Sequence, residues 1–195
     1  MKFWLFASAL VAGGAFGGAR PPLTPQGASR PVTQGKNETL LAGLRPGRDS
    51  YAVAQKRFKT ASLVSEKDSR EKRWYDPCSG RAISLELDAQ SIIQSITITT
   101  LAPRTGPCGA RRPNFLDSGN WQTGYGVRMG DPQDRIYAAY GEPNSSGPSV
   151  HRGHELELLF YQFDWAGSDV PQVMEVLCAR DTGRVVQITL AFPSL

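Results

Sequence analysis

The chain has 195 residues, a formal net charge of +4 and 40% hydrophobic residues. This length is enough for one domain or two small ones. After residue 19 no apolar run is long enough to cross a membrane, and the basic residues are not interleaved with aromatic ones. A mature transmembrane protein and a nucleic-acid-binding protein are therefore not expected.

Residues 1–19 have the pattern of an export signal. Lys2 provides a positive start, an apolar run from Phe3 to Ala12 follows, and small residues come after it. The run is too short for a mature membrane-spanning helix, although an uncleaved anchor is the alternative reading. We therefore expect a periplasmic or secreted protein. A lipid anchor is not expected, because no cysteine lies near the cleavage region.

Residues 20–38 are predicted to form a linker. They contain almost nothing apolar to bury, and four prolines alternate with threonine, glutamine, glycine and serine: Pro21, Pro22, Pro25 and Pro31. Such a composition favours an extended, solvated chain.

A first unit is expected over residues 39–101. Asp49 or Ser50 is a suitable N-cap for a short helix that places Tyr51 and Phe58 on one face. Alternating residues then predict strands over Lys72–Tyr75, Ala82–Leu87 and Ile92–Thr99. The polar stretch 62–72 before them reads as a second helix or a loop.

The cysteines predict one disulfide. Cys78 and Cys108 lie among turn-forming residues, whereas Cys178 lies in an apolar run. In an exported protein we expect Cys78 to pair with Cys108 and Cys178 to be a buried thiol. A metal site is the competing reading, but no Cys-x-x-Cys is present and the histidines are distant in the sequence.

Residues 102–122 are predicted to be a connecting loop, because proline, glycine and arginine dominate them. Charge also divides near this segment. Through Arg112 there are 17 Lys/Arg and 8 Asp/Glu, a net of +9, whereas from Pro113 there are 5 and 10, a net of −5. Either the two halves complement each other in charge and pack together, or the basic half binds an acidic partner.

A second unit is expected over residues 123–195. Gly126-x-x-x-Gly130 repeats the spacing of Gly43-x-x-x-Gly47, and Ile136 and Tyr140 give a short helix its apolar face. After a predicted loop over 144–152, the strands expected are Glu155–Phe163, Val173–Ala179 and Val185–Phe192. In the first of these, Leu156, Leu158, Phe160 and Gln162 share one side. The fold class predicted is α+β, with two similar units that each pack short helices on a small antiparallel sheet.

The second unit resembles the SmpA/OmlA lipoprotein family, which includes small components of the outer-membrane protein assembly machinery. The residues that carry the resemblance are Gly126 to Asp131, Tyr140-Gly141-x-Pro143, Leu159-Phe160-Tyr161 and Gly183-Arg184-Val185-Val186. The fold of that family also occurs in tandem in the β-lactamase inhibitor protein. The resemblance implies a periplasmic or secreted module whose sheet or loops contact another protein.

No catalytic residue, cofactor or metal site is predicted. His151 and His154 are the most site-like pair, but a structural zinc site normally has four protein ligands. No serine lies in a nucleophile elbow, and no glycine-rich loop has the pattern that holds phosphate. The alternatives to a binding protein are a small hydrolase or metal-dependent enzyme that uses this histidine loop, and a purely structural envelope protein.

The predicted function is therefore binding of another protein, which we expect to be acidic, by a monomeric chain that acts as an inhibitor or an envelope-assembly accessory. Trp121 and Trp165 lie among polar residues and are candidates either for interface anchors or for core positions. Lys72, Arg111 and Arg112 are the candidate basic contacts in the first half of the chain.

Overall fold

A computed structural model describes residues 36–59, 70–106, 108, 114–163 and 172–192 of this protein. The described residues belong to one compact unit. Its elements are α1 (Tyr51–Phe58), β1 (Glu71–Asp76), β2 (Arg81–Leu87), β3 (Ile93–Thr99), the 3-10 helices η1 (Asn114–Leu116) and η2 (Ser118–Asn120), α2 (Gln133–Tyr140), β4 (Ser145–His151), β5 (His154–Phe163), β6 (Gln172–Ala179) and β7 (Val185–Ala191). None of these helices is long and apolar enough to cross a membrane.

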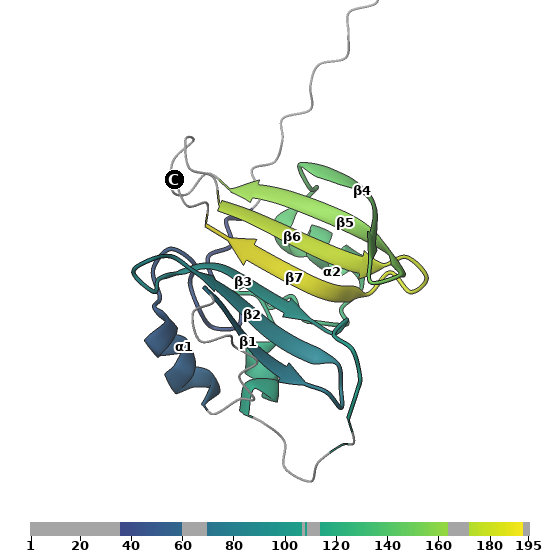
Figure 1. Ribbon diagram of the computed structural model, residues 1–195. Helices are drawn as coiled ribbons and strands as arrows, with labels where there is room; N and C mark the ends of the chain where they lie inside the picture. Colours follow the sequence, from purple (N-terminus) through teal and green to yellow (C-terminus); the bar gives the residue numbers. More distant parts are fainter. Residues whose placement is uncertain (1–35, 60–69, 107, 109–113, 164–171, 193–195) are drawn as a thin grey trace, which may run out of the picture. The chain divides into compact units, whose positions relative to one another are not determined.

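All the strands form a single antiparallel sheet of seven strands in the order β1-β2-β3-β7-β6-β5-β4. The two halves of the chain meet where β3 pairs with β7, from Ser95 opposite Ala191 to Thr99 opposite Gln187. The Oγ1 atoms of Thr97 and Thr189 lie 3.0 Å apart across this pair. Figure 1 shows the sheet running without interruption from β1 to the β4 hairpin.

The prediction of two similar α+β units is therefore wrong, since the protein is mainly β. Each half has one α-helix of only eight residues, followed by its strands. Two separate small sheets would each leave edge strands with unpaired backbone N–H and C=O groups. Pairing β3 with β7 satisfies two of these edges and merges the apolar faces of both halves.

One continuous core lies on the helix side of the sheet. Phe58 of α1 packs edge-on against Trp74 of β1, with 5.0 Å between the ring centroids. In the other half, Tyr140 of α2 contacts Tyr161 of β5 at 5.7 Å. Ile residues of β3 and β7 join these clusters at the centre of the sheet: Ile96, Ile98 and Ile188. In Figure 1 α2 lies behind β6 and β7, so this part of the sheet is seen from the face that α2 does not cover.

The short helices form where the sequence predicted them. The first begins after Ser50 and buries Ala54 and Phe58, and the second buries Ile136 and Tyr140. Gly141 ends the second helix at a φ of 80°, a conformation that costs glycine little. The stretch 62–72 was expected to be a second helix or a loop. Positions 62–69 lie outside the described residues, and Glu71 and Lys72 at its end belong to β1.

Two predictions in the second half are corrected. The stretch 144–152 is largely the strand β4 rather than a loop, and Pro148 is tolerated there because β4 is an edge strand. In β5 the side that faces the core is Leu159, Tyr161 and Phe163, whereas Leu158 and Phe160 are half-buried on the other face. Both faces of β5 carry apolar residues, so alternation alone could not choose the inner side.

The connecting segment is ordered where it is described. Phe115 and Leu116 of η1 are buried, and Trp121 follows η2 with only 4% of its surface exposed. The indole Nε1 of Trp121 donates a hydrogen bond to the carbonyl oxygen of Phe115 at 2.8 Å. This segment therefore closes the core on the helix side.

Candidate binding cleft on the open sheet face

The open face is the side of the sheet that carries no helix. The strand registers align one row of side chains across this face, in the order Arg73, Ser84, Thr97, Thr189, Glu175, Phe160 and Ser145. Toward β1 the row is made of hydroxyl and guanidinium groups. These side chains are only half-buried from Arg73 to Thr189, so a partner can reach them.

A hollow of about 250 Å³ lies on this face, and we call it the face cleft. The strands β1, β2 and β3 supply its floor, including Arg73, Ser84 and Thr97. His151 and Arg152, from the turn between β4 and β5, also line it. Because the sheet order separates β4 from β1 by five strands, the sheet must curl to bring this turn against the first half.

A larger hollow of about 840 Å³, the end cavity, lies beside the face cleft. Its walls are the segment Thr100–Arg104, the turn between β4 and β5, and the turn between β6 and β7. Leu101 and Arg152 line both hollows, so the two are neighbours.

Backbone hydrogen bonds hold the wall segment in place. The N–H of Thr100 donates to the oxygen of Val186 at 2.9 Å, and that of Ala102 donates to Gly80 at 3.0 Å. The hydroxyl of Tyr75 donates to the carbonyl oxygen of Pro103. The wall is therefore fixed to both β7 and the first half of the sheet.

Arg73 has one buried polar atom that is not satisfied. Its Nε is buried and has no hydrogen-bond acceptor within the described ranges. The guanidinium carbon lies 5.3 Å from the centroid of the Tyr75 ring, which is itself held by Pro103. The Arg73 side chain as a whole is half-buried and lines the face cleft, so a carboxylate of a bound molecule would find a guanidinium partner there.

The turn that carries Arg152 has an unusual residue choice. Arg152 has a φ of 51° and Gly153 a φ of 79°, and His151 pairs with His154 across the hairpin. A two-residue hairpin turn with both central φ angles positive normally has asparagine or glycine at the first position. An arginine there retains some strain.

The histidine pair does not build a recognised metal centre. His151 lines the face cleft and His154 the end cavity. Among the residues that the structure describes, no group of three His, Cys, Asp or Glu side chains is placed to hold a metal ion.

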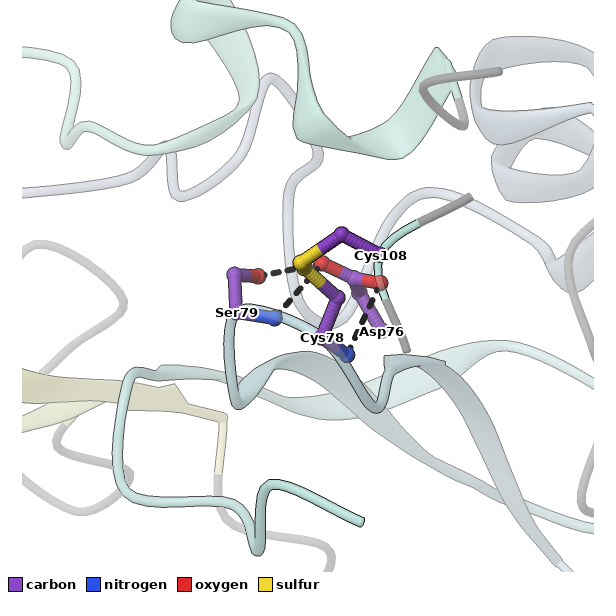
Figure 2. Close-up of a disulfide and its surroundings, with 4 residues drawn as sticks. All are labelled: Asp76, Cys78, Ser79 and Cys108. Carbon is purple, nitrogen blue, oxygen red and sulfur yellow. Dashed lines mark hydrogen bonds between the residues drawn. A yellow bond between two sulfur atoms is a disulfide. The ribbon is translucent and has the colours of Figure 1, made fainter. Parts of the chain in front are cut away.

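The predicted disulfide between Cys78 and Cys108 is confirmed, with Cα atoms 4.9 Å apart. Figure 2 shows Asp76 beside it, accepting hydrogen bonds from the backbone N–H groups of Cys78 and Ser79 and from the Ser79 hydroxyl. Burial opposes ionisation of Asp76, but these hydrogen bonds outweigh it and lower the pKa of Asp76 below 3.8. The disulfide is compatible with an oxidising, extracellular or periplasmic compartment.

Cys178 is a free cysteine with none of its surface exposed. Burial, and the nearby carboxylate of Glu157, raise the pKa of its thiol from 9.0 to about 11. The prediction of a buried thiol is therefore confirmed.

The predicted binding residues do not lie together. Trp121 is a core residue, with the guanidinium of Arg81 5.2 Å from its ring centroid, and so it is not available as a surface anchor. Lys72 lies on the helix side, where its Nζ is 5.8 Å from the Tyr51 ring centroid. Trp165, Arg111 and Arg112 lie outside the described residues.

Sequence reasoning missed Arg73 and Arg152. Arg73 precedes Trp74, and alternation along a strand whose tryptophan is buried would have assigned Arg73 to the opposite face. No local signal places Arg152 near it, because the approach depends on the curl of the sheet.

No protein-family model and no curated protein matches the sequence. The similarity to solved structures is low. YjgB, a DUF4309 family protein of Bacillus subtilis, aligns over 77% of this chain and 83% of its own, with 10% identity and a TM-score of 0.45. SAV1118, a cysteine-rich secretory protein of Staphylococcus aureus, aligns over 82% of this chain but 47% of its own, with 11% identity and a TM-score of 0.42. These values support no argument about function, and the resemblance to the SmpA/OmlA family stays a prediction.

Proposed function

We propose that this chain is an exported, non-catalytic binding protein that holds another protein against the open face of its sheet. The observation that carries the proposal is the face cleft, where the half-buried Arg73 places a guanidinium group on a paired strand. A site built on strands keeps its geometry without ordering a loop, which lowers the entropic cost of binding.

An acidic contact on the partner suits this region. Arginine side chains contribute to the lining of the face cleft or the end cavity at four positions: Arg73, Arg104, Arg152 and Arg180. Guanidinium groups bind carboxylates through paired hydrogen bonds, which adds direction to the charge attraction. The half-buried Leu158 and Phe160, farther along the open face, provide apolar area for the same partner.

Export by the N-terminal signal is part of this proposal. The confirmed disulfide fits an oxidising compartment, and the apolar run from Phe3 to Ala12 fits a cleaved signal. Mass spectrometry of the protein recovered from the envelope or the medium tests this, since it reports the first residue of the mature chain. An uncleaved N-terminus would contradict the cleaved signal.

The proposal is tested by blocking the cleft. Ser84 lies on its floor, and tryptophan is well accepted in strands, so Ser84→Trp fills the cleft without removing a core contact. Ala138→Trp, on the exposed side of α2, is the matched control. Each variant and the wild type are immobilised and used to capture partners from an envelope extract of the source cell at low and moderate salt.

We expect one specific partner to be captured by the wild type and by Ala138→Trp, and to be lost with Ser84→Trp. Capture that weakens as salt rises supports the role of the arginines. Equal capture by all three proteins would show that the open face is not the contact surface. No capture by any of them would favour the structural alternative.

A further inference from the structure

We infer that the face cleft binds an extended peptide segment in which a carboxylate side chain and a basic side chain are separated by one residue. This inference rests on the proposed function and names the chemistry that the partner presents. It follows from the charges on the cleft floor and from their spacing along the strands.

Opposite charges lie at adjacent places on the floor. Arg73 pairs with Ser84 across β1 and β2, and Glu86 lies two residues beyond Ser84 on the same face. Diagonal neighbours of this kind have Cβ atoms about 7–8 Å apart. Both Arg73 and Glu86 line the cleft. A ligand therefore meets a cation and an anion at that separation.

An extended peptide matches this spacing. Successive residues of a strand rise about 3.3 Å, so side chains two positions apart project from one face at roughly 6.6 Å. The carboxylate of such a segment reaches the guanidinium of Arg73, and its basic side chain reaches Glu86. The hydroxyl of Ser84 lies on the same floor and can hydrogen-bond to a peptide backbone. The hydroxyls of Thr97 and Thr99 border it, but they already contact Thr189, Val186 and Leu101.

Arg152 gives the carboxylate a second partner. Its turn closes the cleft from the opposite edge of the sheet, and its side chain also borders the end cavity. Arg152 places a cation at this position although its positive φ is an unfavourable backbone conformation for arginine. We assign the two guanidinium groups to one carboxylate.

A polyanion suits the cleft poorly. Glu71 lies opposite Glu86 in the β1–β2 pair and faces the same side, and both residues line the cleft. Like charges would repel a phosphate group or a run of acidic residues placed between them and the arginines. The volume of about 250 Å³ accommodates a few side chains rather than a folded surface.

The probes are short blocked peptides titrated into isotope-labelled protein and followed by NMR chemical shifts. Acetyl-Ser-Lys-Ser-Glu-Ser-amide and its reverse order, acetyl-Ser-Glu-Ser-Lys-Ser-amide, test both chain directions. Comparison peptides replace Lys, Glu or both by Gln. A peptide with two Glu residues and inorganic phosphate test the polyanion alternative.

We expect at least one mixed-charge peptide to shift the amides of β1, β2 and the turn at Arg152. Arg73→Gln should weaken binding of that peptide about tenfold or more. Arg135→Gln, on the exposed side of α2, should leave its affinity unchanged. Arg152→Asn should also weaken it, and asparagine is well accepted in this turn, so loss of folding is not a concern. Thermal unfolding of each variant checks that Arg73→Gln remains folded, and Arg73→Lys provides a milder substitution if it does not.

Glu86→Gln gives the sharpest test, because it forms a double-mutant cycle with the peptide. Replacing Lys by Gln in the peptide should weaken binding to the wild type but have no effect on binding to Glu86→Gln. The inference is overturned if no mixed-charge peptide shifts the cleft amides, if Arg73→Gln binds as well as the wild type, or if phosphate or the two-Glu peptide binds more tightly.

The inference and the proposed function fail in different ways. If an envelope partner is lost with Ser84→Trp but captured normally by Arg73→Gln and Glu86→Gln, the open face binds the partner and the mixed-charge recognition is wrong. If the peptides bind as expected and Ser84→Trp still captures the partner, the cleft recognises peptides and the proposed contact surface is wrong.

Discussion

At the scale of single residues, Glu38 ties the start of the described chain to α2. Only 1% of it is exposed, and its Oε1 accepts hydrogen bonds from the N–H groups of Thr39 and Leu40 at 2.9 and 2.8 Å. Its Oε2 accepts from the N–H of Tyr125 at 3.1 Å and from the hydroxyl of Tyr140 at 2.6 Å. Burial first, and then this carboxylate, raise the pKa of Tyr140 far above 10.0. Glu38 is thus a fully engaged buried carboxylate.

Glu38→Gln should lower the free energy of unfolding by about 2–3 kcal/mol. The glutamine NH₂ group would face the N–H and O–H donors that now point at the carboxylate, and these donors would lose a charged acceptor. Urea unfolding measures the change. Glu142→Gln, at an exposed position just after α2, is the control and should change stability little. A loss from Glu38→Gln no larger than that of the control would show that the network is not important for stability.

Cys178 gives a pH-dependent contribution to stability at alkaline pH. Its folded pKa of about 11 lies above the ordinary 9.0, so the folded state retains the proton more strongly than the unfolded state. This contribution is fully present below pH 9 and is lost as the pH rises toward 11. The wild type should therefore lose more stability across this window than Cys178→Ala, as measured by urea unfolding at several pH values. Parallel pH profiles would contradict this assignment.

At the scale of elements, the disulfide joins the turn after β1 to the segment that follows β3. Cys78 and Cys108 are 30 positions apart, and closing a loop of that length restricts the unfolded chain. The double variant Cys78→Ser with Cys108→Ser should lose roughly 3–4 kcal/mol of unfolding free energy. Chemical denaturation measures this loss, and wild-type protein under reducing conditions should match the variant. A variant as stable as the oxidised wild type would show that the loop is restrained by other contacts.

Individual elements could be predicted where the pattern of neighbouring residues is enough to define them. β2 alternates so that Ile83, Leu85 and Leu87 face the core, as their spacing indicates. β4 was missed because serine, glycine and proline fill it, and such residues form a strand only where a neighbour such as β5 pairs with it. The sequence left Trp121 open between an interface anchor and a core position. The structure places it in the core, where its indole donates a hydrogen bond to the Phe115 carbonyl.

At the scale of the whole molecule, the β3–β7 pair makes both halves one folding unit. Ile188 of β7 has none of its surface exposed and lies opposite Ile98 of β3 and Val176 of β6. Its contacts therefore belong to the first half as much as to the second. A cavity at this position should therefore destabilise both halves of the protein.

Ile188→Ala should reduce the free energy of unfolding by about 2–5 kcal/mol. Native-state hydrogen exchange measures where the loss occurs, and amides at the centres of β2 and β5 should lose protection by the same amount. A loss confined to β5 would indicate that the halves unfold separately.

The sequence by itself determined the expectation of export, the pairing of Cys78 with Cys108, the burial of Cys178 and the positions of both short helices. Each depends on the local sequence around the residues concerned or on a pattern with a fixed period. The tertiary structure decided that the halves share one sheet, because Thr97 and Thr189 meet across a separation of 92 positions. It also determined which side of β5 faces the core, and it placed Arg152 beside the cleft that Arg73 lines. These features arise from register and sheet curvature, which are set by contacts between distant segments and leave no local pattern.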